Sequence, residues 1–294
     1  MGKAERNRRQ GAREKIAAQQ AAARRAERRK RLLLTGGSVV AVLAIVVAFV
    51  VVKTLSGPAS AGSGKGTVSA SLVHEITSVP AGTLASVGKG TANPKAILPI
   101  SGTPLTQNGK PEVLYMGAEY CPFCATERWA MTVALSRFGT FSGLKFIHSS
   151  ASDTPASIPT LTFYKSAYTS KYIAFTPVEM QDVNKATLQA PTAAQSAVLA
   201  KYDAPPQVPQ ANAGSIPFID FGNKFMVSGA SYSYTVLQSK TWAQVAAALK
   251  DPSSDIAEGA DGAANMITAA ICKLTGNQPA TACTPTVQAI EGSL

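Results

Sequence analysis

The longest apolar stretch of the chain lies near its N-terminus, from Leu32 to Val52. At a rise of about 1.5 Å per residue, a helix of this length spans roughly 31 Å, the thickness of a hydrocarbon core. The stretch therefore predicts a single transmembrane helix over residues 32–53. A cleaved signal peptide is the alternative, since Ala59-Ser60-Ala61 resembles the small-residue site at which such peptides are cut.

The charge of the chain is unevenly distributed around this stretch. Residues 1–31 contain 12 Lys and Arg against three Glu, which accounts for +9 of the net charge of +11. The positive-inside rule then places the N-terminus in the cytoplasm and residues 53–294 outside it. Since the excess belongs to a tail beside a membrane, we expect the lipid bilayer as its partner and no nucleic acid. The predicted organisation is a basic tail (1–31), a membrane helix (32–53), a Gly- and Ser-rich flexible linker (54–70) and an extracytoplasmic domain (71–294).

Within the last region, apolar positions alternate between strand and helix periods. Residues 112–117 form an apolar strand, a helix follows as far as Phe138, and residues 144–148 form another strand. Gly139 is expected to end the helix in the left-handed conformation. A crossover of this length predicts that the two strands are parallel.

The following segments continue the α/β pattern. Short alternating stretches at 160–164 and 172–176 predict an antiparallel pair, and 215–221 with 224–227 predicts a hairpin turning at Gly222-Asn223. Helices are expected over 191–202, after a capping box of Thr241 and Gln244, and over about 260–274, where Gly276 is the stop.

The chemistry of the sequence is concentrated at Cys121-Pro122-Phe123-Cys124, between the first strand and its helix. The N–H groups and dipole of a helix N-terminus stabilise an anion, here the thiolate of Cys121. With two residues between them, Cys124 is able to resolve a mixed disulfide formed at Cys121 as the helix begins. Glu119 would disfavour the thiolate if close to it, or would relay a proton to the leaving thiol.

The other two cysteines, Cys272 and Cys283, lie at the end of the last long helix and after it. Outside the cytoplasm they are expected to form a structural disulfide, worth about 3 kcal/mol in the chain-entropy model. The alternative is a second redox pair that relays electrons to a membrane redox partner. No metal or cofactor is expected, because His74 and His148 stand alone and no phosphate-binding or dinucleotide motif occurs.

The order of these elements resembles that of thioredoxin-like proteins over roughly 112–251. The sequence is similar over most of 70–290 to a membrane-anchored thioredoxin-like family catalogued only as a domain of unknown function. The residues that carry this second likeness are Gly117 to Cys124, Glu127-Arg128-Trp129, Arg137-Phe138-Gly139, Ser170 to Ile173, Ile216-Pro217-Phe218 and Ile271 to Gly276.

This resemblance implies a thioredoxin-like fold with a cis-proline beside the cysteine pair. Two positions compete for that proline, Pro159 and Pro217, and we favour Pro217 because a hairpin and a helix follow it. That choice makes residues of about 149–213 a helical and hairpin insertion.

Two functions remain open at this point. The first is a membrane-anchored, extracytoplasmic thiol–disulfide oxidoreductase that acts on protein thiols and disulfides and needs no dissociable cofactor. In this function Cys121, Cys124, Glu119 and Pro217 form the site. The second is a non-catalytic binding or scaffold domain in which a Cys121–Cys124 disulfide is only structural.

Overall fold

The structure, a computed structural model, describes residues 64–294, and it describes side chains from Ala70 onward. The predicted basic tail, membrane helix and most of the linker lie outside these residues. Among residues 64–294, no helix is both long enough and apolar enough to cross a membrane. The end of the predicted linker is helical, since helix α2 runs from Gly64 to Thr77. Ile76, which is fully buried, fixes this helix to the core, and a helix extends readily from an anchored turn.

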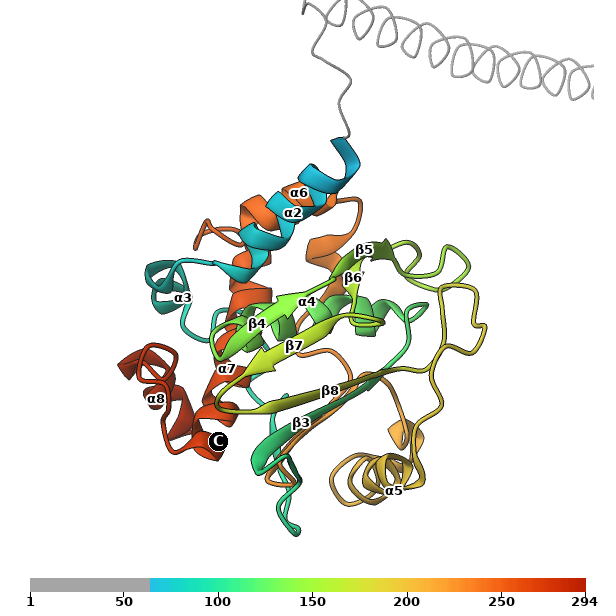
Figure 1. Cartoon of the computed structure of the whole chain (residues 1–294), viewed down its shortest axis with the longest axis vertical. Coiled ribbons are helices and arrows are strands. Elements are labelled where there is room, and N and C mark those ends of the chain that lie inside the picture. The colour runs from blue at the N-terminus through green and yellow to red at the C-terminus, as the bar shows by residue number, and fades with distance from the viewer. Residues whose placement is uncertain (1–63) are drawn as a thin grey trace, which may run out of the picture. The chain divides into compact units, whose positions relative to one another are not determined.

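Strand β3 (Lys110–Gly117) lies at the centre of the main sheet, and its last six residues are buried. It pairs in parallel with β8 (Ala174–Glu179) and antiparallel with β9 (Phe218–Phe221), as the side-by-side ribbons of β3 and β8 in Figure 1 illustrate. Next to β9 come β10 (Phe225–Ser228) and the short β1 (Leu98–Pro99), while β2 (Thr106–Gln107) forms a hairpin with the start of β3. The described chain is therefore a mixed α/β fold around a mixed sheet.

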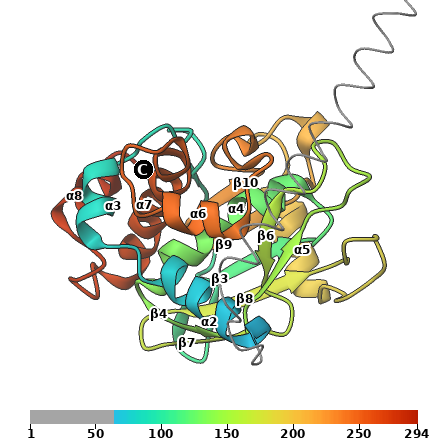
Figure 2. The same cartoon turned by 90° about the horizontal axis from the view of Figure 1, so that it is seen from above.

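Helices cover both faces of this sheet. Val113 and Tyr115 of β3 belong to a core cluster with α4 (Pro122–Ser136) and α7 (Asp255–Thr275), whereas Leu114 and Met116 pack towards α5 (Ala193–Tyr202). Figure 2 shows α3 (Ala81–Val87), α7 and α8 (Pro285–Glu291) gathered on the side away from α5. Both faces of β3 are thus apolar, which explains why its sequence lacks alternation.

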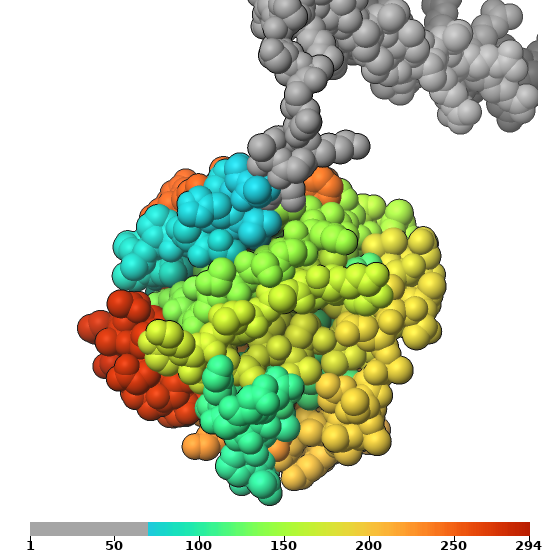
Figure 3. Space-filling view, in the orientation of Figure 1, coloured from blue at the N-terminus to red at the C-terminus, as the bar shows by residue number. Residues whose placement is uncertain are grey.

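The remaining elements lie around this core. In Figure 3, α2 occupies the surface next to residues of α6 (Trp242–Ala248), and the chain around β2 projects beside α5. There the Tyr202 hydroxyl of α5 donates a hydrogen bond to the Ser101 carbonyl oxygen at 3.2 Å. Two small ribbons complete the fold, in which β4 (Gly139–Ser142) pairs with β7 (Ala167–Ser170), and β5 (Lys145–His148) with β6 (Pro159–Thr162). Two 3₁₀ turns cover Gln210–Asn212 and Tyr234–Leu237.

The predicted pairing of the strands around α4 is wrong. Residues 145–148 pair antiparallel with β6, and the parallel partner of β3 is β8, so 160–164 and 172–176 do not pair with each other. The segment 149–213, expected as an insertion, therefore supplies a strand of the main sheet. Three short stretches of similar apolar character compete for the place beside β3, and β8 is the one whose full six-residue length matches it.

Several local predictions are confirmed. The hairpin of β9 and β10 turns at Gly222 and Asn223, both at positive φ. Thr241 and Gln244 form the predicted capping box, and Gly276 ends α7 in the left-handed conformation.

Gly139, by contrast, is not the predicted left-handed cap, because α4 ends at Arg137 and Gly139 begins β4. Glycine is needed there for space, since a Cβ atom would lie 2.4 Å from the Thr169 carbonyl oxygen.

Candidate functional site

The Cys-x-x-Cys pair stands where β3 gives way to α4. Cys121 is the N-cap of α4, and Pro122 occupies the first helical position, where a missing N–H is not needed. The Cys121 sulfur accepts a hydrogen bond from the Cys124 N–H at 3.3 Å. Both cysteines are free thiols; Cys121 is 5% exposed and Cys124 is fully buried behind it.

The two thiols experience opposite electrostatic environments. Hydrogen bonds from Cys124 outweigh burial and lower the pKa of Cys121, with Arg128 contributing in the same direction. Burial raises the pKa of Cys124 well above its ordinary value. Cys121 is thus the thiol that ionises first, and Cys124 keeps its proton at neutral pH.

The Ile216–Pro217 segment lies next to Cys121. The Cys121 thiol donates to the Ile216 carbonyl oxygen, with the sulfur and oxygen 3.7 Å apart, and the Ile216–Pro217 peptide bond is cis. Pro159 has a different place, in the buried strand β6, where its carbonyl oxygen accepts the Trp129 indole N–H at 2.9 Å. The structure therefore brings Cys121, Cys124 and Pro217 together and leaves Pro159 to hold α4.

Glu119 is not hydrogen-bonded to either sulfur within the described residues. Burial raises the pKa of Glu119, and the Thr162 side chain and the charge of Arg128 partly oppose this, while Glu179 adds to it. Thr162 lies on β6, Glu179 on β8 and Arg128 on α4. The structure thus gives no contact for the proton relay that the sequence suggested for this carboxyl group.

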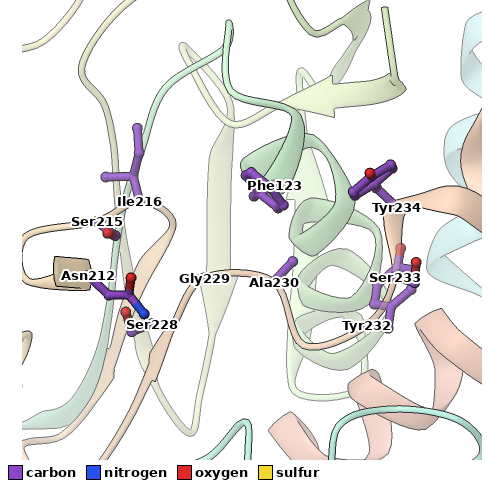
Figure 4. Close-up of a pocket in the computed structure, with 10 residues that line it drawn as sticks. All are labelled: Phe123, Asn212, Ser215, Ile216, Ser228, Gly229, Ala230, Tyr232, Ser233 and Tyr234. Atoms are coloured by element: carbon purple, nitrogen blue, oxygen red, sulfur yellow. The ribbon is translucent and has the colours of Figure 1, made fainter. Parts of the chain in front are cut away.

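A pocket of about 460 Å³ opens beside the cysteine pair, and we call it the Phe123 pocket. Phe123 is 42% exposed and contacts Tyr234 edge-on, with ring centroids 5.9 Å apart. Figure 4 shows these two rings on one side of the pocket and Asn212, Ser215 and Ile216 on the other. None of the lining side chains carries a charge; they are Phe123, Asn212, Ser215, Ile216, Ser228, Gly229, Ala230, Tyr232, Ser233 and Tyr234.

Glu127 holds in place the pocket wall formed by the loop after β10. Its carboxylate accepts the Ser231 N–H at 2.7 Å and the Ser231 hydroxyl at 2.8 Å, which ties the loop after β10 to α4. Burial raises the pKa of Glu127 to about 7, although the two bonds from Ser231 oppose the shift. Tyr232 adds a third tie, since its hydroxyl donates to the Thr126 carbonyl oxygen at 2.8 Å.

Arg128 and Glu179 form a buried ion pair close to the turn that carries Cys121. The Arg128 guanidinium binds the Glu179 carboxylate with both a 2.8 Å and a 2.7 Å hydrogen bond, and both side chains are fully buried. Arg128 also donates to the Ala118 carbonyl oxygen at 2.7 Å, so it links α4, β8 and the turn that carries Cys121. Sequence reasoning missed this pair; its one available signal is an arginine four residues after Cys124 on the same helix face.

Cys272 and Cys283 are joined in a disulfide that connects the end of α7 to the segment before α8. Both are buried among residues of the main core cluster. Within residues 64–294 no group of three or more His, Cys, Asp or Glu residues is arranged to hold a metal ion.

Residues 96–273, more than half of the chain, match the model of a family described as "Domain of unknown function (DUF929)". The chain belongs to the DUF929 family. No curated protein and no solved structure shows significant similarity to the chain. The match confirms the expected likeness to a family catalogued only as a domain of unknown function. It includes Cys121, Cys124, Arg128, Glu179 and Pro217, and it ends just after Cys272.

Proposed function

We propose that this protein exchanges thiols and disulfides with polypeptide substrates through Cys121 and Cys124. The observation that carries the proposal is the position of the Cys121 sulfur. It accepts the Cys124 N–H at the start of α4 and lies 3.7 Å from the Ile216 carbonyl oxygen at the edge of the Phe123 pocket. A thiol with a lowered pKa therefore stands beside a pocket that accommodates part of a substrate.

We further propose that the core is thioredoxin-like. Supporting this are the strand order β8-β3-β9-β10, the parallel pairing of β3 with β8 and the antiparallel pairing of the other neighbours. The cysteine pair follows β3, and Ile216-Pro217 precedes the hairpin of β9 and β10. This is the element order that the resemblance implies, with β8 in place of residues 144–148.

The proposed reaction proceeds in two balanced steps. The Cys121 thiolate attacks a substrate disulfide and forms a mixed disulfide, while the second substrate sulfur leaves with the electron pair and takes up a proton. Cys124 then loses its proton and attacks the Cys121 sulfur, which releases the remaining substrate sulfur as a thiol. The substrate disulfide gains two electrons and the Cys121–Cys124 pair becomes a disulfide; the reverse sequence oxidises a substrate dithiol. A second dithiol protein, which we place in the membrane, would restore the pair.

The lining of the Phe123 pocket supports a polypeptide as the substrate. Phe123 and Tyr234 offer aromatic surface to an apolar side chain, and the absence of charge in the lining favours an uncharged segment beside the reactive sulfur. In this proposal Pro217 positions the Ile216 carbonyl group and one pocket wall. We place the reaction outside the cytoplasm on a domain anchored by residues 32–53, on the strength of the apolar stretch and the basic tail.

Selective alkylation of the reduced full chain tests this proposal. Cys121 is expected to react in the folded protein, with a midpoint at lower pH than that of an ordinary exposed cysteine titrated alongside, because its pKa is lowered. Cys124 is expected to stay unmodified until urea is added, because it is fully buried. Peptide mapping by mass separates the two sites.

The competing function, a binding domain with a structural pair, is favoured by one observation, the low exposure of both sulfurs. It predicts that neither cysteine reacts in the folded protein. That result, or reaction of Cys124 before Cys121, would count against the exchange function.

A further inference from the structure

Two buried donors, one on β3 and one on α4, have no hydrogen-bond partner among the described residues. One is the Tyr115 hydroxyl and the other is the Nη1 group of Arg128, and both side chains are fully buried. The other donors of Arg128 are occupied by Glu179 and Ala118. A buried polar group without a partner destabilises a fold, and the charge of a Cys124 thiolate acts on both of these groups. A functional reason for the two unpaired donors is therefore worth seeking at Cys124.

The position of the Tyr115 hydroxyl is tightly defined. A Cβ atom on Gly117 would lie 2.2 Å from the Tyr115 hydroxyl oxygen, so the hydroxyl fills the space against Gly117 where β3 ends. The next residue, Ala118, supplies the backbone hydrogen bond that favours the Cys124 thiolate. The Tyr115 hydroxyl therefore lies against Gly117, the residue before Ala118, and a side chain at position 117 would displace it.

Packing alone does not explain a tyrosine at this position. The ring of Tyr115 is surrounded by apolar residues and lies edge-on to Phe163, with centroids 5.2 Å apart. Phenylalanine would make the same ring contacts without burying an unpaired oxygen. Burial raises the pKa of Tyr115 well above its ordinary value, so the hydroxyl keeps its proton and remains a donor.

We propose that the Tyr115 hydroxyl donates a hydrogen bond to the Cys124 thiolate that forms during resolution of the mixed disulfide. The inference rests on the proposed exchange function. In that step Cys124 loses its proton, the Cys124–Cys121 bond forms, the bond from Cys121 to the substrate sulfur breaks, and the departing sulfur takes the electron pair and a proton. Tyr115 keeps its own proton throughout and acts as a positioning residue.

The charged groups around Cys124 support this role. Arg128 lies one helical turn after Cys124, with its guanidinium carbon 6.0 Å from the centre of the Tyr115 ring, and its charge favours the thiolate. Glu179 on β8 offsets part of this charge through its two hydrogen bonds from Arg128, while the Nη1 group of Arg128 has no partner among the described residues. The neighbouring Cys121 is uncharged in the mixed disulfide. Tyr115 and Arg128 are thus the favourable partners that an otherwise apolar site offers to an anion.

The test is the Tyr115→Phe variant of the full chain, reacted with glutathione disulfide and quenched at intervals. Attack by Cys121 is expected to stay within twofold of wild type. Resolution by Cys124 is expected to slow about tenfold or more at neutral pH, the loss expected for one hydrogen bond to a charged group, and its pH midpoint is expected to rise. The urea midpoint of unfolding is expected to stay equal or increase, because an unpaired buried hydroxyl has been removed.

Tyr168→Phe is the matched control. The Tyr168 hydroxyl donates to the Leu135 carbonyl oxygen at 2.8 Å near the other end of α4, so its removal is expected to lower the urea midpoint and leave resolution unchanged. Unchanged resolution in Tyr115→Phe, or a loss of stability like that of Tyr168→Phe, would overturn the inference. Failure of the wild-type Cys121 to react with glutathione disulfide would instead remove the exchange function itself.

Discussion

Replacement of Arg128 by methionine is expected to destabilise the protein by about 3–5 kcal/mol, because it leaves the Glu179 carboxylate buried without its cation. The remaining bond to that carboxylate, from the Phe163 N–H at 3.3 Å, is too weak to replace two bonds from a guanidinium. Urea unfolding of the full chain, followed by the fluorescence of the buried Trp129, measures the loss.

Two further variants make this prediction specific. Lys250→Met removes the cation of an exposed pair with Glu75, whose side chains are 41% and 32% exposed, and is expected to cost less than about 1 kcal/mol. The double variant Arg128→Met with Glu179→Gln removes the orphaned charge and is expected to recover part of the lost stability. Equal losses in Arg128→Met and Lys250→Met would contradict the structural role assigned to the buried pair.

The second large effect concerns activity. Cys121→Ser is expected to reduce exchange with a disulfide-containing peptide by about a thousandfold or more, as when other enzymes lose their nucleophile. Cys124→Ala is expected to retain the first step and to accumulate the mixed disulfide on Cys121, because the resolving thiol is missing. Non-reducing mass analysis of each variant distinguishes the two outcomes.

Folding itself is expected to survive in Cys121→Ser, since serine at a helix N-cap accepts the same hydrogen bond from the N–H of residue 124. A Cys272→Ala variant serves as the comparison, because it removes a disulfide that lies outside the proposed site. Exchange by Cys121→Ser at the wild-type rate would exclude Cys121 as the nucleophile.

Local chemistry made the cysteine turn and the last hairpin predictable. Cys121 precedes a proline in a first helical turn, and Gly222-Asn223 provides the two positive φ angles that a tight hairpin requires. Each of these signals involves residues within a few positions of one another. The structures that they predict therefore depend little on how the rest of the chain folds.

The pairing of β3 with β8 was not predictable in the same way. It joins residues that are about sixty positions apart, across two small ribbons that have similar apolar patterns. Pro177 is tolerated within β8 because β8 has one paired neighbour among the described strands and lies at an edge.

The buried charged and polar groups near the cysteines could not be predicted from the sequence for a related reason. Arg128 and Glu179 are 51 residues apart, and only folding makes them partners. From the sequence, a tyrosine in an apolar strand such as Tyr115 is expected to be a core residue. Only the structure shows that its hydroxyl has no partner among the described residues. The sequence therefore identified the cysteine pair of the proposed site and missed the buried groups whose charges act on it.

The reduction potential of the Cys121–Cys124 pair tests the exchange function most directly. The full chain would be equilibrated in glutathione buffers, alkylated and mapped by mass, with Cys272 and Cys283 scored separately. A dedicated exchange pair is expected between about −120 and −270 mV, with an oxidase or isomerase towards the upper end and a reductase towards the lower. A potential below about −300 mV would mark a structural disulfide and would contradict the proposed function.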